Sequence, residues 1–93
     1  MIKTLSGDAS YGIDSDATAT ISGNIVIVAE YGIYVNGNNN AVTGNYVTGC
    51  VNGIFIVTAT TCNVNCGNRS TGNSTANYTD NGTATVSIGN LYT

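Results

Sequence analysis

The chain has 93 residues, enough for one small domain, and only 8% of them are charged, with a formal net charge of −3. This charge argues against nucleic-acid binding and against anionic membrane surfaces, because no basic stripe exists to neutralise phosphates. No apolar run approaches the roughly 20 residues of a transmembrane helix. The start of the chain also lacks the apolar region of a signal peptide, so we expect either a protein made in the cytosol or a fragment that begins with an added Met.

Gly-Asn pairs recur along the chain at intervals of 21, 23 and 22 residues. A second marker, Gly-Ile, keeps nearly the same period at positions 12–13, 32–33 and 53–54. A period in this range is typical of a solenoid, in which each repeat is one coil stacked on the next. The pairs are Gly23-Asn24, Gly44-Asn45, Gly67-Asn68 and Gly89-Asn90.

The two markers divide the sequence into repeats within a single domain, 1–93. Residues 1–10 are expected to form a partial N-terminal turn, and no linker follows them. The fourth repeat is atypical, because Asn77 and Tyr78 stand roughly where Gly-Ile is expected. The predicted coils are 11–30, 31–51, 52–74 and 75–93.

Each repeat contains short runs in which apolar residues alternate with polar ones, as in strands. After the Gly-Ile markers, this period of two predicts an inward column of Ile13, Ile33 and Ile54. The residues between the inward positions, Asp14, Tyr34 and Phe55, then point outward. A second inward column is predicted just before the Gly-Asn pairs, from Ile21, Val42, Val64 and Val86, if the last two repeats contain a one-residue insertion.

The Gly-Asn pairs are interpreted as corners of the coil. Glycine supplies the unusual backbone conformation that a sharp corner needs, and asparagine also tolerates it. An asparagine side chain has one acceptor and two donors, so stacked asparagines can bond to one another every strand spacing, about 4.8 Å. The predicted ladder is Asn24, Asn45, Asn68 and Asn90.

This repeat, Gly-Ile-x-aliphatic followed by turn residues and aliphatic-x-Gly-Asn-x-aliphatic, resembles that of right-handed parallel β-helices. That group is similar to pectate-lyase-like folds and includes phage tailspike shafts. The resemblance covers about residues 11–91 and implies an all-β, right-handed parallel β-helix of about four coils with 21–23 residues each. It is specific for the fold and carries little information on function.

Several outward positions are apolar or aromatic, which a monomer seldom exposes as a patch. We interpret them as an interface with a partner chain, and stacking on sugar rings or scattered exposure are the alternatives. Open ends of a solenoid also need caps, so we expect a homo-oligomer or end-to-end stacking with another β-structure. The interface candidates are Tyr34, Phe55, Ile25, Ile27 and Tyr46.

Asp14 and Asp16 are the candidate carboxylates for chemistry, because they share a face at positions i and i+2. Paired carboxylates can act on a glycosidic bond, and they can also hold calcium or remain solvated. Neighbouring repeats do not continue the pair, and the chain contains no histidine. We therefore expect no enzyme and no cofactor, with a polysaccharide hydrolase or lyase as the alternative.

The cysteines Cys50, Cys62 and Cys66 are expected to be buried thiols, with a Cys62–Cys66 disulfide or a metal site as alternatives. Thr-Ala-Thr occurs three times, at 18–20, 58–60 and 83–85, and such arrays on a flat sheet resemble insect ice-binding solenoids. The irregular register of these triplets favours turn residues.

Taken together, these features predict a structural or assembly module. The resemblance implies a virion or tail-fibre component, trimeric and exposed on the particle or outside a cell. A carbohydrate-binding or carbohydrate-cleaving module is the first alternative, with a surface glycan as its partner. An ice-binding protein is the second alternative.

Overall fold

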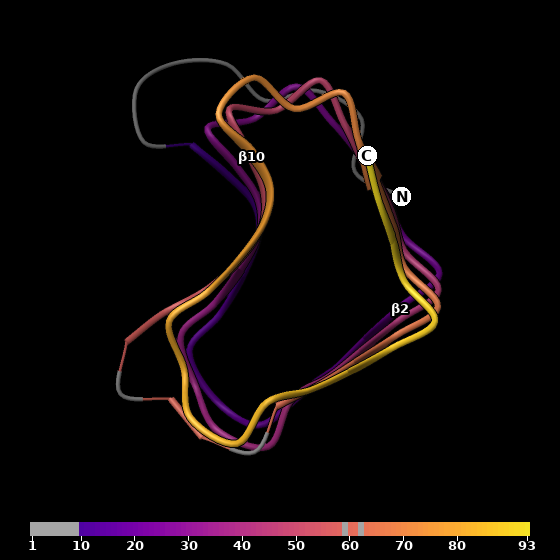
Figure 1. Ribbon diagram of the computed structural model, residues 1–93. Coiled ribbons are helices and arrows are strands. Elements are labelled where there is room, and N and C mark those ends of the chain that lie inside the picture. The colour runs from indigo at the N-terminus through magenta and orange to yellow at the C-terminus, as the bar shows by residue number, and fades with distance from the viewer. Residues whose placement is uncertain (1–9, 59, 62) are drawn as a thin grey trace.

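The computed structural model describes residues 10–58, 60–61 and 63–93 of the chain. These residues form a parallel β-solenoid of about four coils, seen down its axis in Figure 1, and they contain no helix. The predicted fold class is therefore confirmed as a stacked, parallel, all-β coil. The expected partial turn of residues 1–10 lies, except for Ser10, outside the described residues.

Three parallel four-stranded sheets run along the solenoid, and each coil contributes one strand to each sheet. Sheet 1 contains β1 (Tyr11–Ser15), β4 (Tyr31–Val35), β7 (Asn52–Ile56) and β10 (Ala76–Asp80). Sheet 2 contains β2 (Thr20–Ser22), β5 (Ala41–Thr43), β8 (Val64–Cys66) and β11 (Val86–Ile88). Sheet 3 contains β3 (Ile25–Ile27), β6 (Tyr46–Thr48), β9 (Arg69–Thr71) and β12 (Leu91–Tyr92).

The core is a stack of aliphatic side chains inside the coils. Ile33 pairs with Ile54 and Val35 with Ile56 across sheet 1, and all four side chains are fully buried. Val26 and Val47 face them from sheet 3 and are also fully buried. Burying this apolar surface stabilises the fold, and the column predicted after the Gly-Ile markers is the one observed.

The Gly-Ile marker has a steric cause. In sheet 1 the glycine and the following isoleucine both face the interior, so the glycine lies against the sheet 3 strand of the same coil. A Cβ on Gly32 would collide with Val47 Cγ1 and come within 2.7 Å of Gly53 O. Only glycine fits this approach.

All three corners contain left-handed residues; at the corner between sheets 1 and 2 these are Asn39 and Ala84, both at φ 57°. At the corner between sheets 2 and 3, Gly23, Gly44, Gly67 and Gly89 have φ between 63° and 66°. The glycine, and not the asparagine after it, therefore takes the strained conformation. At the corner between sheets 3 and 1, Gly49 and Gly72 take φ of 69° and 67°, whereas the first coil has Val28 there, at φ 62°.

The predicted column through Val64 and Val86 is wrong. Val42 pairs with Asn65, and Ala41 pairs with Val64, so the valines of the last two coils point outward, with 39% and 45% exposure. The connection from sheet 1 to sheet 2 is two residues longer in the third coil than in the second, where one was expected. A one-residue slip moves every side chain of a strand to the other face.

The fourth coil keeps the register but changes the filling of the interior. Tyr78 pairs with Ile54, and Tyr92 pairs with Ser70, so two tyrosines take inward positions. Their rings stack 4.5 Å apart at an interplanar angle of 3°. The atypical sequence of this repeat therefore still forms a coil, and large rings cover the aliphatic core at its C-terminal end.

Candidate functional site

The Gly-Asn asparagines form a continuous hydrogen-bonded ladder at the corner between sheets 2 and 3. Asn45 Oδ1 accepts from the N–H and the Nδ2 of Asn24, at 2.9 and 3.2 Å. Asn45 Nδ2 donates to Asn68 Oδ1 at 3.0 Å and to the Ile21 carbonyl at 2.8 Å. Asn68 repeats the pattern with Asn90. The ladder satisfies buried polar groups, so these residues are scaffold.

Two further asparagine pairs, which the sequence did not reveal, support the other corners. Asn40 donates from its N–H and Nδ2 to Asn63 Oδ1 at 2.8 and 3.1 Å. Asn73 makes the same two bonds to Asn77 Oδ1, at 3.1 and 2.9 Å. The spacing of 23 residues from Asn40 to Asn63, the same as from Asn45 to Asn68, was the signal that could have identified the first pair.

Four aromatic rings form a strip on the outer face of sheet 1. We call Tyr11, Tyr31, Tyr34 and Phe55 the aromatic strip. Tyr34 and Phe55 stack with ring centroids 5.7 Å apart, and Tyr11 and Tyr31 stack at 5.4 Å. Tyr31 joins the two pairs, with its centroid 5.0 Å from Tyr34 and 5.1 Å from Phe55. Each ring is half-buried, so one surface of the strip faces solvent.

Asp14 and Asp16 lie at the N-terminal side of this strip. Asp14 pairs with Tyr34 in the sheet, and both carboxylates are exposed. Desolvation raises the pKa of Asp14, and its hydrogen bond to Asp16 and the charge of Asp16 act in the same direction. The pKa of Tyr34 is raised as well, first by desolvation and then by the neighbouring tyrosines and carboxylates.

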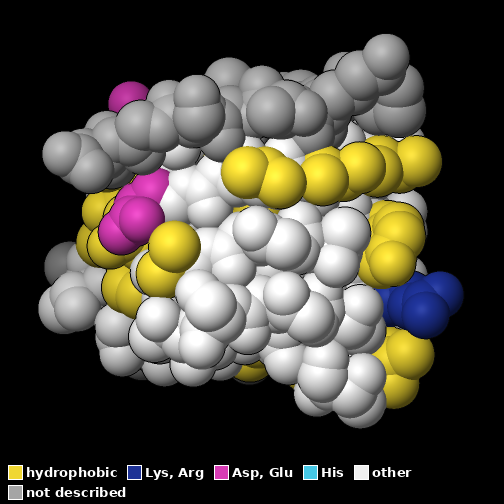
Figure 2. Space-filling view, turned by 90° about the horizontal axis from the view of Figure 1, so that it is seen from above, with side chains coloured by type: hydrophobic (Ala, Val, Ile, Leu, Met, Phe, Trp, Pro, Cys, Tyr) yellow, Lys and Arg dark blue, Asp and Glu magenta, His cyan; other side chains and the backbone are white. Residues whose placement is uncertain are grey.

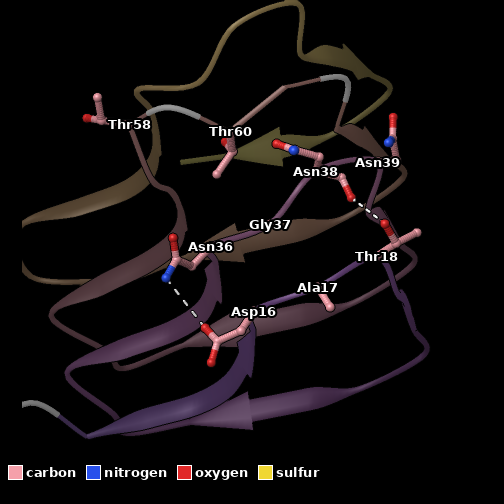
Figure 3. A pocket seen from close by; sticks show the side chains of 9 residues that line it. All are labelled: Asp16, Ala17, Thr18, Asn36, Gly37, Asn38, Asn39, Thr58 and Thr60. Atoms are coloured by element: carbon pink, nitrogen blue, oxygen red, sulfur yellow. Dashed lines mark hydrogen bonds between the residues drawn. The ribbon is translucent and has the colours of Figure 1, made fainter.

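A polar hollow of about 510 Å³ opens where sheet 1 turns into sheet 2 (Figure 3). Asp16 stands at one side of it, with its Oδ1 3.5 Å from Asn36 Nδ2. Thr18 Oγ1 donates to the Asn38 carbonyl at 2.9 Å on the other side. The hollow offers carboxamides, hydroxyls and one carboxylate, a lining suited to a polar ligand. Its lining residues are Asp16, Ala17, Thr18, Asn36, Gly37, Asn38, Asn39, Thr58 and Thr60.

The outer face of sheet 3 carries a mixed apolar column. Ile25, Tyr46, Arg69 and Leu91 follow one another in register. The Arg69 guanidinium lies 5.0 Å from the centre of the Tyr46 ring, a cation–π contact. Figure 2 shows this face from the side, at the right of the view, with hydrophobic side chains above and below a basic one. A row of hydrophobic side chains also crosses the upper part of the same view.

Exposed large apolar side chains concentrate in the first and the last coil. Ile25, Ile27 and Val28 are exposed by 36 to 43% in the first coil. In the fourth coil Val86, Ile88 and Leu91 are exposed by 45 to 60%. Between these coils, Val64 is the one further residue of this kind among those described. The two ends of the solenoid are therefore more apolar outside than its middle.

The cysteines and the threonine triplets take ordinary positions. Cys50 is a buried thiol whose pKa is raised by desolvation, and Cys66 is exposed on the outer face of sheet 2, contrary to the expectation that it is buried. Cys62 lies outside the described residues, so its predicted alternatives stay predictions. Thr18, Thr60 and Thr83 all lie in the turn between sheets 1 and 2, away from a flat sheet face.

Comparison of the chain with protein-family models, curated proteins and solved structures found no match. In the described part of the chain, no helix is long and apolar enough to cross a membrane. The same residues contain no group of three or more metal-ligand side chains arranged to hold an ion.

Proposed function

We propose that this protein is a structural module that assembles with further β-structure. The observation that carries the proposal is the concentration of exposed apolar side chains in the first and last coils. Each such side chain loses contact with water when a neighbour covers it, which stabilises the assembly by about 25 cal/mol for each Å² of apolar surface buried. The interior of asparagine ladders and aliphatic columns is a rigid scaffold for such contacts.

The finer proposal is a homotrimeric component of a virion or tail fibre, exposed outside a cell. Its support is the resemblance of the repeat to tailspike-type β-helices, together with a surface of low charge that is rich in asparagine and threonine. A trimer would place one outer sheet of each copy against its neighbours. The proposed partners are therefore further copies of the same chain.

Sedimentation velocity tests the assembly proposal directly. The wild-type chain, measured over a series of micromolar concentrations, is expected to sediment faster than a monomer as the concentration rises. Ile27→Lys replaces an exposed apolar side chain of the first coil with a charge and is expected to weaken assembly, because a lysine ammonium resists desolvation. A wild-type protein that stays monomeric throughout would contradict the proposal.

Carbohydrate binding is the second candidate function, and the aromatic strip favours it. Stacked rings with one open surface suit the flat apolar face of a sugar ring. Asp14 and Asp16 stand beside the strip, and Asp16 also lines the polar hollow, so hydroxyl groups could be bound at both places. A cleavage reaction would use the two carboxylates as acid and base.

A glycan panel separates binding from cleavage. If the strip binds sugars, Phe55→Ala should lower the affinity about fivefold, because a stacking contact on an aromatic ring is worth about 1 kcal/mol. Asp14→Asn combined with Asp16→Asn should abolish turnover while the stacking contribution remains. Thr43→Ala, on sheet 2, is the control and should bind glycans as the wild type does. A wild type with neither detectable binding nor detectable turnover would end this candidate.

A further inference from the structure

The C-terminal end of the solenoid repeats an interface that the chain already uses between its own coils. At the corner between sheets 2 and 3, each glycine N–H donates to a carbonyl of the next coil: Gly23 to Thr43, Gly44 to Cys66 and Gly67 to Ile88, at 3.1 to 3.2 Å. Each asparagine N–H there donates to the Oδ1 of the next asparagine, at 2.8 to 3.0 Å. Both bonds point toward the C-terminal coil.

In the fourth coil this series stops with its donors unpaired. Within the described part of the chain, the N–H groups of Gly89 and Asn90 have no acceptor. Asn90 Nδ2, which would otherwise donate to the next asparagine, turns to Ser87 Oγ at 3.0 Å. Two consecutive N–H groups therefore face out of the end of the coil. By analogy with the earlier coils, the Gly89 N–H would bind a backbone carbonyl and the Asn90 N–H would bind a carboxamide oxygen.

The three strands of this coil are edge strands in all three sheets. In β11, the Val86 N–H donates to the Asn63 carbonyl, and the Ile88 carbonyl accepts from Gly67. Because parallel strands alternate their bonding direction, the Ser87 N–H faces the open end. A free edge of this kind is a template for another strand.

Two further features of the same end lack a partner. The Tyr92 hydroxyl is buried and makes no hydrogen bond of good geometry among the described residues, although Ser87 lies near enough to lower its pKa. Ile88 and Leu91, exposed by 60 and 48%, flank the unpaired N–H groups of the corner. Donors and apolar side chains therefore stand together at this end.

We propose that the C-terminal edge formed by β10, β11 and β12 binds the N-terminal end of a second copy of this chain, head to tail. This inference rests on the proposed assembly function and names its contact. A second copy is the occupant because β1, β2 and β3 of the first coil form the opposite edge of the same three sheets, and Asn24 Oδ1 in that coil accepts no hydrogen bond among the described residues. Joining the two ends pairs the free edges of the three sheets, and the contact continues the coil-on-coil stacking seen inside the chain.

A head-to-tail contact does not close on itself, so it generates open linear assemblies. Negative-stain electron microscopy should show rods of constant width whose length increases with protein concentration. Lateral association, as in a trimer, would instead give particles of constant length and greater width. The two arrangements are therefore distinguished by the dimension that grows.

Two variants locate the contact. Ser87→Pro removes an N–H that faces the open end, and proline blocks an edge strand from pairing; the dissociation constant should rise about tenfold or more. Val64→Lys introduces a charge on the same outer column one coil earlier, where stacking leaves the surface exposed. Val64→Lys should assemble as the wild type does.

The outcomes separate the two proposals. A wild type that never assembles overturns both. A wild type that assembles, together with a folded Ser87→Pro variant that assembles equally well, overturns the head-to-tail contact and leaves the assembly function standing. If circular dichroism shows that Ser87→Pro is unfolded, amide hydrogen exchange of the wild type decides: the Gly89 and Asn90 amides must become protected on concentration, and unchanged exchange overturns the contact.

Discussion

Gly32 shows at the residue scale why the repeat keeps a glycine before its isoleucine. An alanine Cβ would collide with Val47 Cγ1 inside a fully packed coil, and the Gly53 carbonyl leaves no room for it to move. We expect Gly32→Ala to lower the free energy of unfolding by about 3 kcal/mol. Urea unfolding measures this change.

Gly23→Ala is the matched control for that experiment. Nothing lies within 4 Å of a Cβ built on Gly23, but its φ is +66°. Its cost is backbone strain alone, about 1 kcal/mol. Equal losses for the two variants would show that crowding inside the coil is not the reason for the Gly-Ile marker.

Val28 is the residue whose backbone fits its side chain worst. It is a β-branched residue at φ 62°, in the position that Gly49 and Gly72 occupy in the next coils. Val28→Gly should raise the thermal midpoint, because the strain relieved, about 1–2 kcal/mol, exceeds the entropy cost of glycine, about 0.5–1 kcal/mol. Ile27→Gly, in the adjacent strand, should lower the midpoint, and a fall for both variants would contradict the argument.

Tyr92 makes stability depend on alkaline pH. Burial raises the pKa of its phenol from 10.0 to about 12 in the folded protein. The folded state therefore keeps its proton where the unfolded state loses it, so stability is complete below pH 10 and falls as the pH rises from 10 toward 12. Tyr92→Phe should flatten most of this fall, and the raised pKa of Tyr78 accounts for a remainder. Unfolding curves at several pH values provide the measurement.

At the scale of elements, the asparagine ladder joins neighbouring coils at the corner between sheets 2 and 3. The Gly-Asn pairs that form this corner contain no apolar side chain, so hydrogen bonds hold the coils together there. Asn45→Ala would remove the acceptor of the Asn24 N–H and leave the Ile21 carbonyl and Asn68 Oδ1 short of a donor. Leaving buried polar groups unpaired costs about 1–3 kcal/mol for each group. We expect a loss of about 3 kcal/mol, measured by urea unfolding.

Asn24→Ala provides the comparison for that prediction. Its Nδ2 bonds are to Asn45 Oδ1 and to the Ser22 carbonyl, in a less buried part of the corner. It should lose less than half as much stability as Asn45→Ala. Similar losses for the two variants would show that each asparagine stabilises only its own turn. The continuous series of hydrogen bonds between coils would then add no stability.

The elements differ in how well the sequence predicts them. Sheet 1 and sheet 3 follow the markers closely, so the columns through Ile33 and Val47 were predictable from a period of two. The strands of sheet 2 come after the turn from sheet 1, whose length varies between coils. In the third coil this turn is one residue longer than the sequence predicted, which places Val64 outside and Asn65 inside. Turn length is set by local backbone geometry, which apolar periodicity does not report.

The candidate site shows the same division. Tyr34 and Phe55 were predicted to point outward in one column, and they do. Their assembly with Tyr11 and Tyr31 into the aromatic strip was not predicted, because the inward glycine places two successive outward residues three positions apart. The polar hollow arises from the turns of three different coils, and no repeat pattern indicates it.

At the scale of the whole molecule, stability is expected to fall from the middle of the solenoid toward its C-terminal end. Each coil contacts only its neighbours, so the fourth coil is held on one side, while coils two and three are held on both. Its interior also contains Tyr78 where the middle coils contain Ile33 and Ile54, and Tyr92 where they contain Val47 and Ser70. The fourth coil should therefore open without unfolding the rest.

Amide hydrogen exchange in dilute solution measures this gradient. The Asn45 amide donates to the buried carboxamide of Asn68 and should exchange at least about 100-fold more slowly than the Asn90 amide, whose N–H has no acceptor among the described residues. The Asn68 amide donates to Asn90 in the fourth coil and should lie between the two. Leu91, whose N–H donates to the Asn68 carbonyl at 2.8 Å, should be intermediate, because it exchanges when the fourth coil opens. Equal protection of Asn45 and Leu91 would mean that the solenoid opens only as one unit, and it would contradict this gradient of stability.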